Sequence, residues 1–176
     1  VAARKQAVLL AGHPEAKVRA TPMLEAVSSR VFDLGEEASS ASIVKLAANF
    51  LIASAIEAMA EAFSLTAKNN TDPQALYEVL AASMFACPVY QNYGRIILNK
   101  DYSDPMFKLE LGLKDILLVA ETANDSRTPM RFLRVLEDRL LSAMAHGQGD
   151  MDWTVTAAEV GYESGLEHAH KSSRQP

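Results

Sequence analysis

The chain has little cysteine and no excess of positive charge. Cys87 is the single cysteine among 176 residues, which excludes an internal disulfide and a cysteine-based zinc site and fits a reducing compartment. Lys and Arg number 17 against 22 Asp and Glu, giving a formal net charge of −5, whereas a nucleic-acid-binding surface needs clustered basic side chains. Because 49% of the residues are hydrophobic and only 22% are charged, the composition excludes disorder and supplies one sizeable core.

The sequence also lacks a recognisable secretion signal and a charge-free membrane span. No basic segment followed by a small-residue cleavage site opens the chain. The long apolar stretch 43–67 contains Lys45, Asn49, Glu57 and Glu61, and charged groups are costly inside hydrocarbon. We therefore expect a buried helix of a soluble, cytoplasmic protein with neither a membrane nor a nucleic acid as partner.

The first 35 residues predict a strand, a helix and a parallel strand. The apolar run 7–12 ends at a glycine, the helical pattern opens at His13-Pro14, and residues 30–35 alternate polar and apolar side chains. Thr21-Pro22 predicts a second helix start within this segment. Two strands alone make no stable sheet, and the chain lacks an initiator methionine. We therefore expect the carboxyl-terminal part of a longer protein, beginning inside an α/β domain.

The remaining residues predict helices. The expected helices run from about 40 to 68, 73 to 86, 107 to 123 and 129 to 145, with a weaker pattern from 153 to 166 and a loop over 87–94 after the helix-breaking Pro88. The predicted fold class is mainly α: a helical domain, 37–176, built around a long central helix and preceded by the α/β remnant, 1–36.

The long helix carries two polar residues apart from its other polar side chains. At about 100° per residue, Lys45 and Asn49 lie about 40° apart. Its later polar residues form a separate stripe that we expect to face solvent: Glu57, Glu61, Ser64 and Lys68. In one interpretation Lys45 reaches water at the helix end while Asn49 bonds the backbone. In the other, a partly buried lysine donates a proton beside an amide that positions a substrate oxygen.

Two segments, GEEASSASIVKLAANF (residues 35–50) and FKLELGLKD (residues 107–115), carry a resemblance to a known family. They resemble the β-hydroxyacid dehydrogenases, which include 3-hydroxyisobutyrate dehydrogenases and glyoxylate/succinic semialdehyde reductases. The segment GEEASSASIVKLAANF, residues 35–50, is similar to the family's junction, in which Asn follows Lys by four residues at the start of a long interdomain helix. Ser39 and Ala41 stand where that family usually has glycine. The segment FKLELGLKD, residues 107–115, is similar to its motif of an aromatic residue before a Lys-Asp pair.

The resemblance implies a set of site residues. Lys45, Asn49 and Asp115 would be catalytic, and Lys114 and Phe107 would lie on the cofactor side. If a helix begins at Phe107, Lys114 and Asp115 share a stripe with it within about 80°. The alternative is a surface Lys-Asp pair that flanks a core phenylalanine.

The implied fold is the end of a Rossmann-type domain followed by a helical substrate-binding and dimerisation domain. The implied activity is an NAD(P)-dependent oxidoreductase acting on a small hydroxyacid, aldehyde or semialdehyde, without a metal, as a homodimer or homotetramer. The Gly-x-Gly-x-x-Gly phosphate turn is not in these residues, so this chain alone should bind cofactor poorly. The alternative function is a non-catalytic helical dimerisation module. An imine reductase relative would generally lack the lysine at position 45.

Other features give weaker indications. Tyr90 or Tyr93 in the predicted loop could contact a substrate, and Cys87 could be a nucleophile. His168 and His170 could bind a metal, and Asp150 and Asp152 resemble half of a calcium loop. The alternative in each case is ordinary packing or solvation. For each of them we favour the ordinary role.

Overall fold

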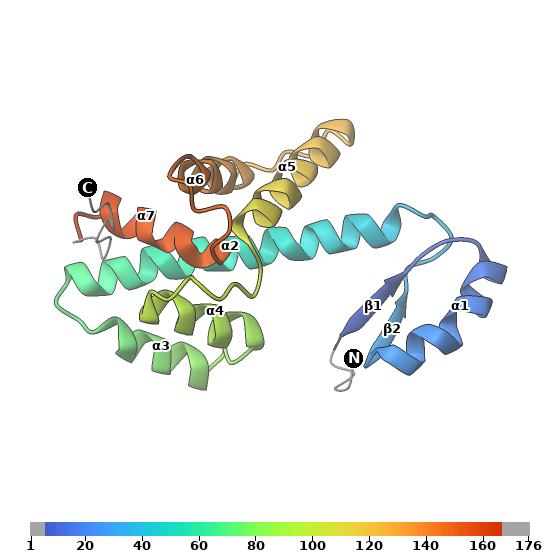
Figure 1. The fold of residues 1–176 in the computed structure, drawn as a ribbon, viewed down its shortest axis with the longest axis horizontal. Coiled ribbons are helices and arrows are strands. Elements are labelled where there is room, and N and C mark those ends of the chain that lie inside the picture. The colour runs from blue at the N-terminus through green and yellow to red at the C-terminus, as the bar shows by residue number, and fades with distance from the viewer. Residues whose placement is uncertain (1–5, 167–176) are drawn as a thin grey trace, which may run out of the picture. The chain divides into compact units, whose positions relative to one another are not determined.

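The computed structural model describes residues 6–166, which form mainly α-helices and one small parallel sheet (Figure 1). The described residues divide into two compact units, with the division after Ala48, inside a long helix. Each unit is described by itself. The boundary expected between residues 36 and 37 stays a prediction.

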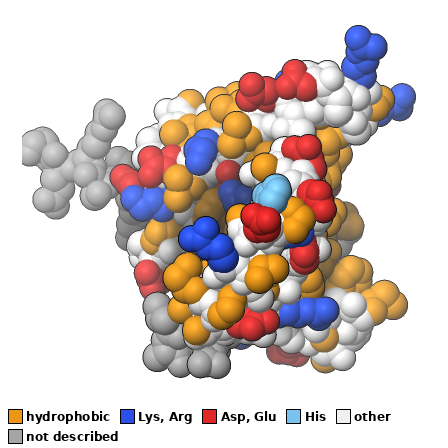
Figure 2. Space-filling view, turned by 90° about the vertical axis from the view of Figure 1, so that its right-hand side faces the viewer, with side chains coloured by type: hydrophobic (Ala, Val, Ile, Leu, Met, Phe, Trp, Pro, Cys, Tyr) orange, Lys and Arg blue, Asp and Glu red, His pale blue; other side chains and the backbone are white. Residues whose placement is uncertain are grey.

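The smaller unit is the predicted strand–helix–strand unit. It contains β1 (Ala7–Leu10), α1 (Pro14–Val27) and β2 (Arg30–Asp33). The strands pair in parallel, with Ala7 opposite Arg30 and Leu10 opposite Asp33. No residue of α1 is buried. Figure 2 shows solvent-exposed hydrophobic side chains interspersed with charged ones on the face that it displays.

The second helix start predicted at Thr21-Pro22 is wrong, because α1 continues through Pro22. The Thr21 hydroxyl donates backwards to the Lys17 carbonyl at 2.8 Å, so it does not cap a new helix. Proline lacks the N–H that would bond Val18, but its fixed φ is compatible with a helix. The missing bond is therefore tolerated here.

The long helix α2 (Ser40–Lys68) confirms the predicted central helix and carries on from the smaller unit into the larger one. Its buried residues all lie in the part that belongs to the larger unit: Ala53, Ala55, Ile56, Glu57, Met59, Ala60, Phe63 and Ser64. By length and composition alone α2 could cross a membrane. Burial is confined to part of this second half, so the buried helix that the sequence predicts is found only in part, and the predicted solvated stripe is wrong for the buried Glu57 and Ser64.

The larger unit packs short helices around this half of α2. They are α3 (Pro73–Ala82), α4 (Pro88–Asn99), α5 (Leu109–Asp125), α6 (Leu133–Ala145), the 3₁₀ turn η1 (Trp153–Val155) and α7 (Thr156–Glu163). Helix α3 packs on α4, and α6 packs on both α5 and α7 (Figure 1). Ile56, Met59, Leu109, Ile116 and Val155 are among the most buried core side chains.

The loop predicted over residues 87–94 is wrong, because these residues begin α4. Pro88 opens the helix instead of ending one. At the first helical position proline loses no hydrogen bond, since that N–H has no partner within the helix. Gly94 then lets α4 approach α3 and α2 closely: a Cβ there would lie 3.1 Å from the Tyr77 ring and 3.5 Å from the Met59 sulfur.

Candidate functional site

The structure brings together two polar residues from the two sequence motifs. Asn49 on α2 donates from Nδ2 to Asp115 Oδ2 on α5 at 2.6 Å, across 66 residues of sequence. Asp115 is only 3% exposed, and Asn49 is half-buried. A buried carboxylate needs hydrogen-bond donors to offset its desolvation, and the amide supplies one.

Asp115 faces inward because of the periodicity of α5. The buried residues of this helix recur every three or four positions: Leu109, Gly112, Asp115, Ile116, Val119 and Ala123. Asp115 thus belongs to the face that packs on the core. The alternative of a surface Lys-Asp pair is wrong for this carboxylate.

Lys114 points elsewhere. Its side chain is exposed and borders a shallow groove along α5 with Glu110, Leu117 and Glu121. The adjacent residues Lys114 and Asp115 therefore serve different faces of one helix. An ammonium open to solvent suits a phosphate or another anion.

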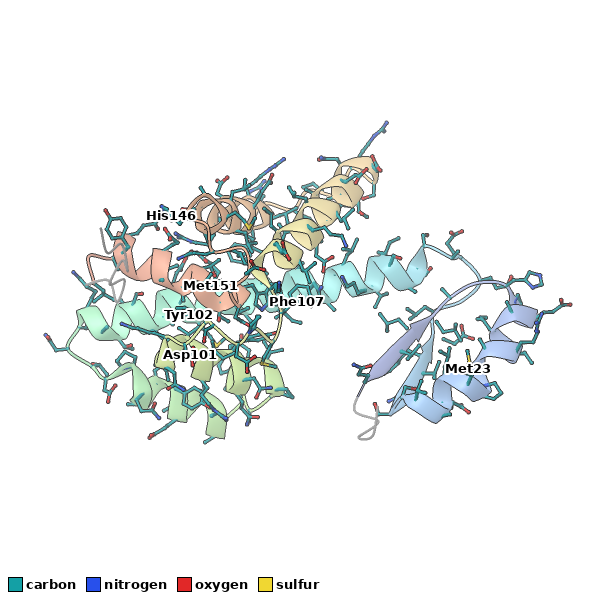
Figure 3. All side chains as sticks on the ribbon, in the orientation of Figure 1. Met23, Asp101, Tyr102, Phe107, His146 and Met151 are labelled. Atoms are coloured by element: carbon teal, nitrogen blue, oxygen red, sulfur yellow. The ribbon has the colours of Figure 1, made fainter. Side chains whose placement is uncertain are left out.

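Phe107 precedes α5, which begins at Leu109, so the helical stripe predicted to start at Phe107 is wrong at its first residue. The Phe107 ring lies edge-on to Trp153, with centroids 4.9 Å apart. Trp153 in turn contacts Tyr93 at 5.8 Å. Figure 3 shows Phe107 beside the loops that carry Tyr102 and Met151. The ring is half-buried and held by aromatic neighbours.

Residues 39–159 match the family model described as the NAD-binding domain of NADP-dependent 3-hydroxyisobutyrate dehydrogenase. The chain belongs to this family. The uncharacterized oxidoreductase YfjR of Bacillus subtilis is 36% identical over 146 residues, which cover 83% of this chain and 51% of YfjR. L-threonate dehydrogenase of Cupriavidus necator is 29% identical over 151 residues, which cover 86% of this chain and 50% of that protein.

A solved structure, the 3-hydroxyisobutyrate dehydrogenase of Salmonella typhimurium, has a similar fold. It superposes with a TM-score of 0.76 and 27% identity, over 84% of this chain and 51% of that one. The chain spans about half the length of the relatives it matches. The resemblance inferred from the two motifs is thereby confirmed.

In this member of the 3-hydroxyisobutyrate dehydrogenase family, Lys45 lies one helical turn before Asn49 on α2. Its side chain is exposed within the chain described here, so the predicted partial burial is not observed. The amide nitrogen of Asn49 donates to a side chain and does not form the backbone bond of the first interpretation. The catalytic role of Lys45 stays a prediction.

The weaker sequence indications find ordinary places in the larger unit. Tyr93 packs on Trp153, and burial raises the pKa of its hydroxyl. The Tyr90 ring lies 4.9 Å from that of Phe85. Cys87 is exposed just before α4. His168 and His170 lie outside the described residues.

Asp152 is the residue whose importance the sequence reading missed. It is completely buried, and both of its carboxylate oxygens accept hydrogen bonds from protein groups. The resemblance to half of a calcium loop is therefore misleading for Asp152. The available signal was the pattern Asp-Trp-Thr, because an aspartate commonly caps the backbone N–H two residues later.

Proposed function

We propose that this chain is the helical, substrate-side part of an NAD(P)-dependent dehydrogenase. The enzyme would transfer a hydride between a nicotinamide cofactor and a small hydroxyacid, aldehyde or semialdehyde. The Asn49–Asp115 hydrogen bond carries the proposal, because it unites the two family motifs at one buried polar site. Relatives named L-threonate dehydrogenase support a small hydroxyacid as substrate.

The chain's own residues would handle the proton and the substrate oxygen. During reduction, the Lys45 ammonium gives a proton to the carbonyl oxygen as negative charge develops there, and during oxidation the neutral amine takes the hydroxyl proton. Exposure of Lys45 lets it exchange the proton with solvent afterwards. Asn49, held by Asp115, offers its second amide N–H to a substrate oxygen.

The cofactor side would be formed by Lys114 and Phe107. The exposed ammonium suits the anionic groups of a dinucleotide, and the half-buried ring offers an apolar wall; both fit such a ligand. When bound, the cofactor supplies or accepts the hydride. Residues outside this chain would provide the glycine-rich phosphate turn, which these 176 residues do not contain.

The same proposal includes a cytoplasmic location and a homodimer or homotetramer formed through the helical domain. Large apolar side chains are exposed on two helices of the larger unit, among them Leu51 and Leu65 on α2 and Leu117 and Leu118 on α5. Burial of such side chains in a subunit interface would be favourable.

The deciding experiment uses the longer protein with its own cofactor domain. Purified protein is assayed for NADPH and NADH consumption with small aldehydes and semialdehydes, and for the reverse reaction with hydroxyacids. Lys45→Ala should lower kcat by about 10²-fold or more, with circular dichroism and cofactor affinity unchanged. Lys68→Ala, an exposed lysine on the same helix, is the matched control and should leave kcat within twofold.

A loss of less than tenfold in Lys45→Ala would overturn the proton-transfer role. Failure of the longer protein to bind either nicotinamide cofactor would overturn the enzyme proposal. That result would favour the alternative, a non-catalytic helical dimerisation module.

A further inference from the structure

Two loops of the larger unit are joined by a ladder of backbone hydrogen bonds. One precedes α5 and the other precedes η1. The N–H groups of Leu109 and Glu110 donate to Met151 and Gly149, at 2.8 and 3.1 Å. In the opposite direction, Asp152 N–H donates to Tyr102 O at 2.9 Å and Trp153 N–H donates to Phe107 O at 3.0 Å. The loop before η1 therefore fixes the start of α5.

The buried carboxylate of Asp152 adds further hydrogen bonds to the connection between these two loops. Oδ2 accepts the backbone N–H groups of Met106 and Phe107, at 2.8 and 3.2 Å. Oδ1 accepts the N–H and the hydroxyl of Thr154, at 3.0 and 2.6 Å. Asp152 and Thr154 are both fully buried, so the two bonds between them are shielded from water.

These bonds hold the Phe107 backbone from both sides. Its N–H points to Asp152, its carbonyl accepts from Trp153, and its ring packs on the Trp153 indole. Figure 3 shows Phe107 near Met151 and Tyr102 of the joined loops. Phe107 has little freedom while the Asp152 carboxylate is in place.

We propose that Asp152 is a positioning residue of the dehydrogenase: it sets the place of Phe107 against the substrate and cofactor. The inference rests on the proposed function. Asp152 itself does not touch the reacting atoms. A small displacement of positioned groups can lower a rate about 10²-fold. Loss of this carboxylate should therefore lower the catalytic rate as well as the stability of the fold.

The test compares three variants in the longer protein. Asp152→Ala removes all four bonds and should lower kcat/KM by about 10- to 100-fold. Asp152→Asn keeps one oxygen for the Met106 and Phe107 N–H groups and should recover at least a third of the wild-type value. Asp150→Ala is the matched control: this exposed carboxylate joins the same loops through Lys108 Nζ, at 2.5 Å, and a surface pair contributes little, so kcat/KM should change less than twofold.

A second measurement separates positioning from simple loss of stability. If Asp152 acts through Phe107, then Asp152→Ala made in a Phe107→Ala background should lower kcat/KM by less than threefold beyond Phe107→Ala alone, although it lowers the wild-type value by about 10- to 100-fold. Fully additive losses would overturn the positioning role. If Asp152→Ala fails to fold, Asp152→Asn decides the question: a kcat/KM below a third of the wild-type value with unchanged amide exchange at Met106 and Phe107 would overturn the positioning role.

Amide hydrogen exchange tests the anchor without any enzyme assay. Exchange at Met106 and Phe107 should accelerate at least tenfold in Asp152→Ala, while Asp152→Asn stays near the wild-type rate and the core of α2 stays protected. Unchanged exchange in Asp152→Ala would overturn the anchor itself. Accelerated exchange in a protein that turns over no nicotinamide cofactor would show that the proposed function fails, and the positioning role with it, although the structural anchor is real.

Discussion

Asn49 and Asp115 are hydrogen-bonded partners, with the amide nitrogen 2.6 Å from a carboxylate oxygen. The bond joins α2 to α5 at a point where the carboxylate is almost fully buried. It fixes the rotamer of Asn49 and thereby the direction of its remaining donor and acceptor. A preorganised amide of this kind costs no reorganisation when a substrate oxygen arrives.

Asn49→Ala should destabilise the protein by about 1–3 kcal/mol, because a buried carboxylate loses a donor. Urea unfolding measures the loss. Asn69→Ala, which removes an exposed amide bonded to the Leu65 carbonyl, is the control and should cost no more than about 0.5 kcal/mol. The double variant Asn49→Ala/Asp115→Ala should lose less than the sum of the single losses. Strict additivity would show that the pair is not coupled.

The sequence predicted the parts of this site that depend on helix periodicity and family motifs. The long helix and the strand–helix–strand unit follow from local patterns of apolar residues, whereas Asp115 was implied by the motif resemblance and a surface Lys-Asp pair stayed open beside it. The contact between Asn49 and Asp115 could not be derived from periodicity alone, because it depends on how α2 and α5 pack. The motif resemblance suggested a common site, and the hydrogen bond now gives it a geometry.

The errors came from residues that have two local meanings. Pro88 can end one helix or open the next, and Pro22 can start a helix or be tolerated within one. Asp152 can likewise be a metal ligand or a capping group, and the sequence favoured an ordinary role over the metal role but did not predict the cap. Pro22 is tolerated because its fixed φ is compatible with a helix. Gly94 allows α4, which Pro88 opens, to pack closely on Tyr77, and Asp152 accepts bonds from the distant Met106 and Phe107 as well as from Thr154.

Gly112→Ala should destabilise the protein. A Cβ there would lie 2.8 Å from the Trp153 ring and 3.4 Å from a Leu140 methyl, and both of those side chains are buried. Overpacking costs about 1–3 kcal/mol, which exceeds the gain of up to about 1 kcal/mol from replacing a helical glycine.

Gly161→Ala is the matched variant for Gly112. Nothing lies within 4 Å of the added methyl in α7, so stability should rise by about 0.5–1 kcal/mol. Thermal unfolding of both variants compares the two sites directly. Equal shifts in Tm would contradict the close contact between α5 and Trp153.

The ion-paired acids around Arg139 should respond to pH in opposite ways. Glu57 lies 3.1 Å from Arg139 and is 2% exposed; Glu163 lies 2.8 Å from Arg139 and is 63% exposed. Burial raises the pKa of Glu57 above its ordinary 4.5, although Arg139 opposes the shift. The hydrogen bond from Arg139 lowers the pKa of Glu163.

Between pH 4.5 and the raised pKa of Glu57, the folded protein therefore binds more protons at Glu57 than the unfolded chain does. The free energy of unfolding from this group falls as pH rises through that window. Glu57→Gln should remove this slope. Glu163 stabilises the folded state above its unfolded pKa, and this stabilisation is lost as pH falls through its lowered pKa in the folded state. Glu163→Gln should therefore alter the free energy of unfolding only in the more acidic range. The change should be small because the side chain is exposed. Urea unfolding from pH 3 to about 8 measures both slopes, and an unaltered slope above pH 4.5 in Glu57→Gln would contradict the assignment.

Lys114→Ala should weaken the binding of NADPH or NADH without slowing the chemical step. The exposed ammonium on α5 is proposed to contact an anionic group of the cofactor. Its loss should raise the cofactor KM about tenfold, which corresponds to about 1.4 kcal/mol. The value of kcat should change less than threefold. Screening of exposed charges by salt predicts that the difference between wild type and Lys114→Ala narrows as ionic strength rises. Lys68→Ala controls for the loss of one positive charge and should leave the cofactor KM unchanged. A fall in kcat at constant KM would instead place Lys114 with the groups that act on the substrate, because only an interaction made in the transition state alone is lost in that way.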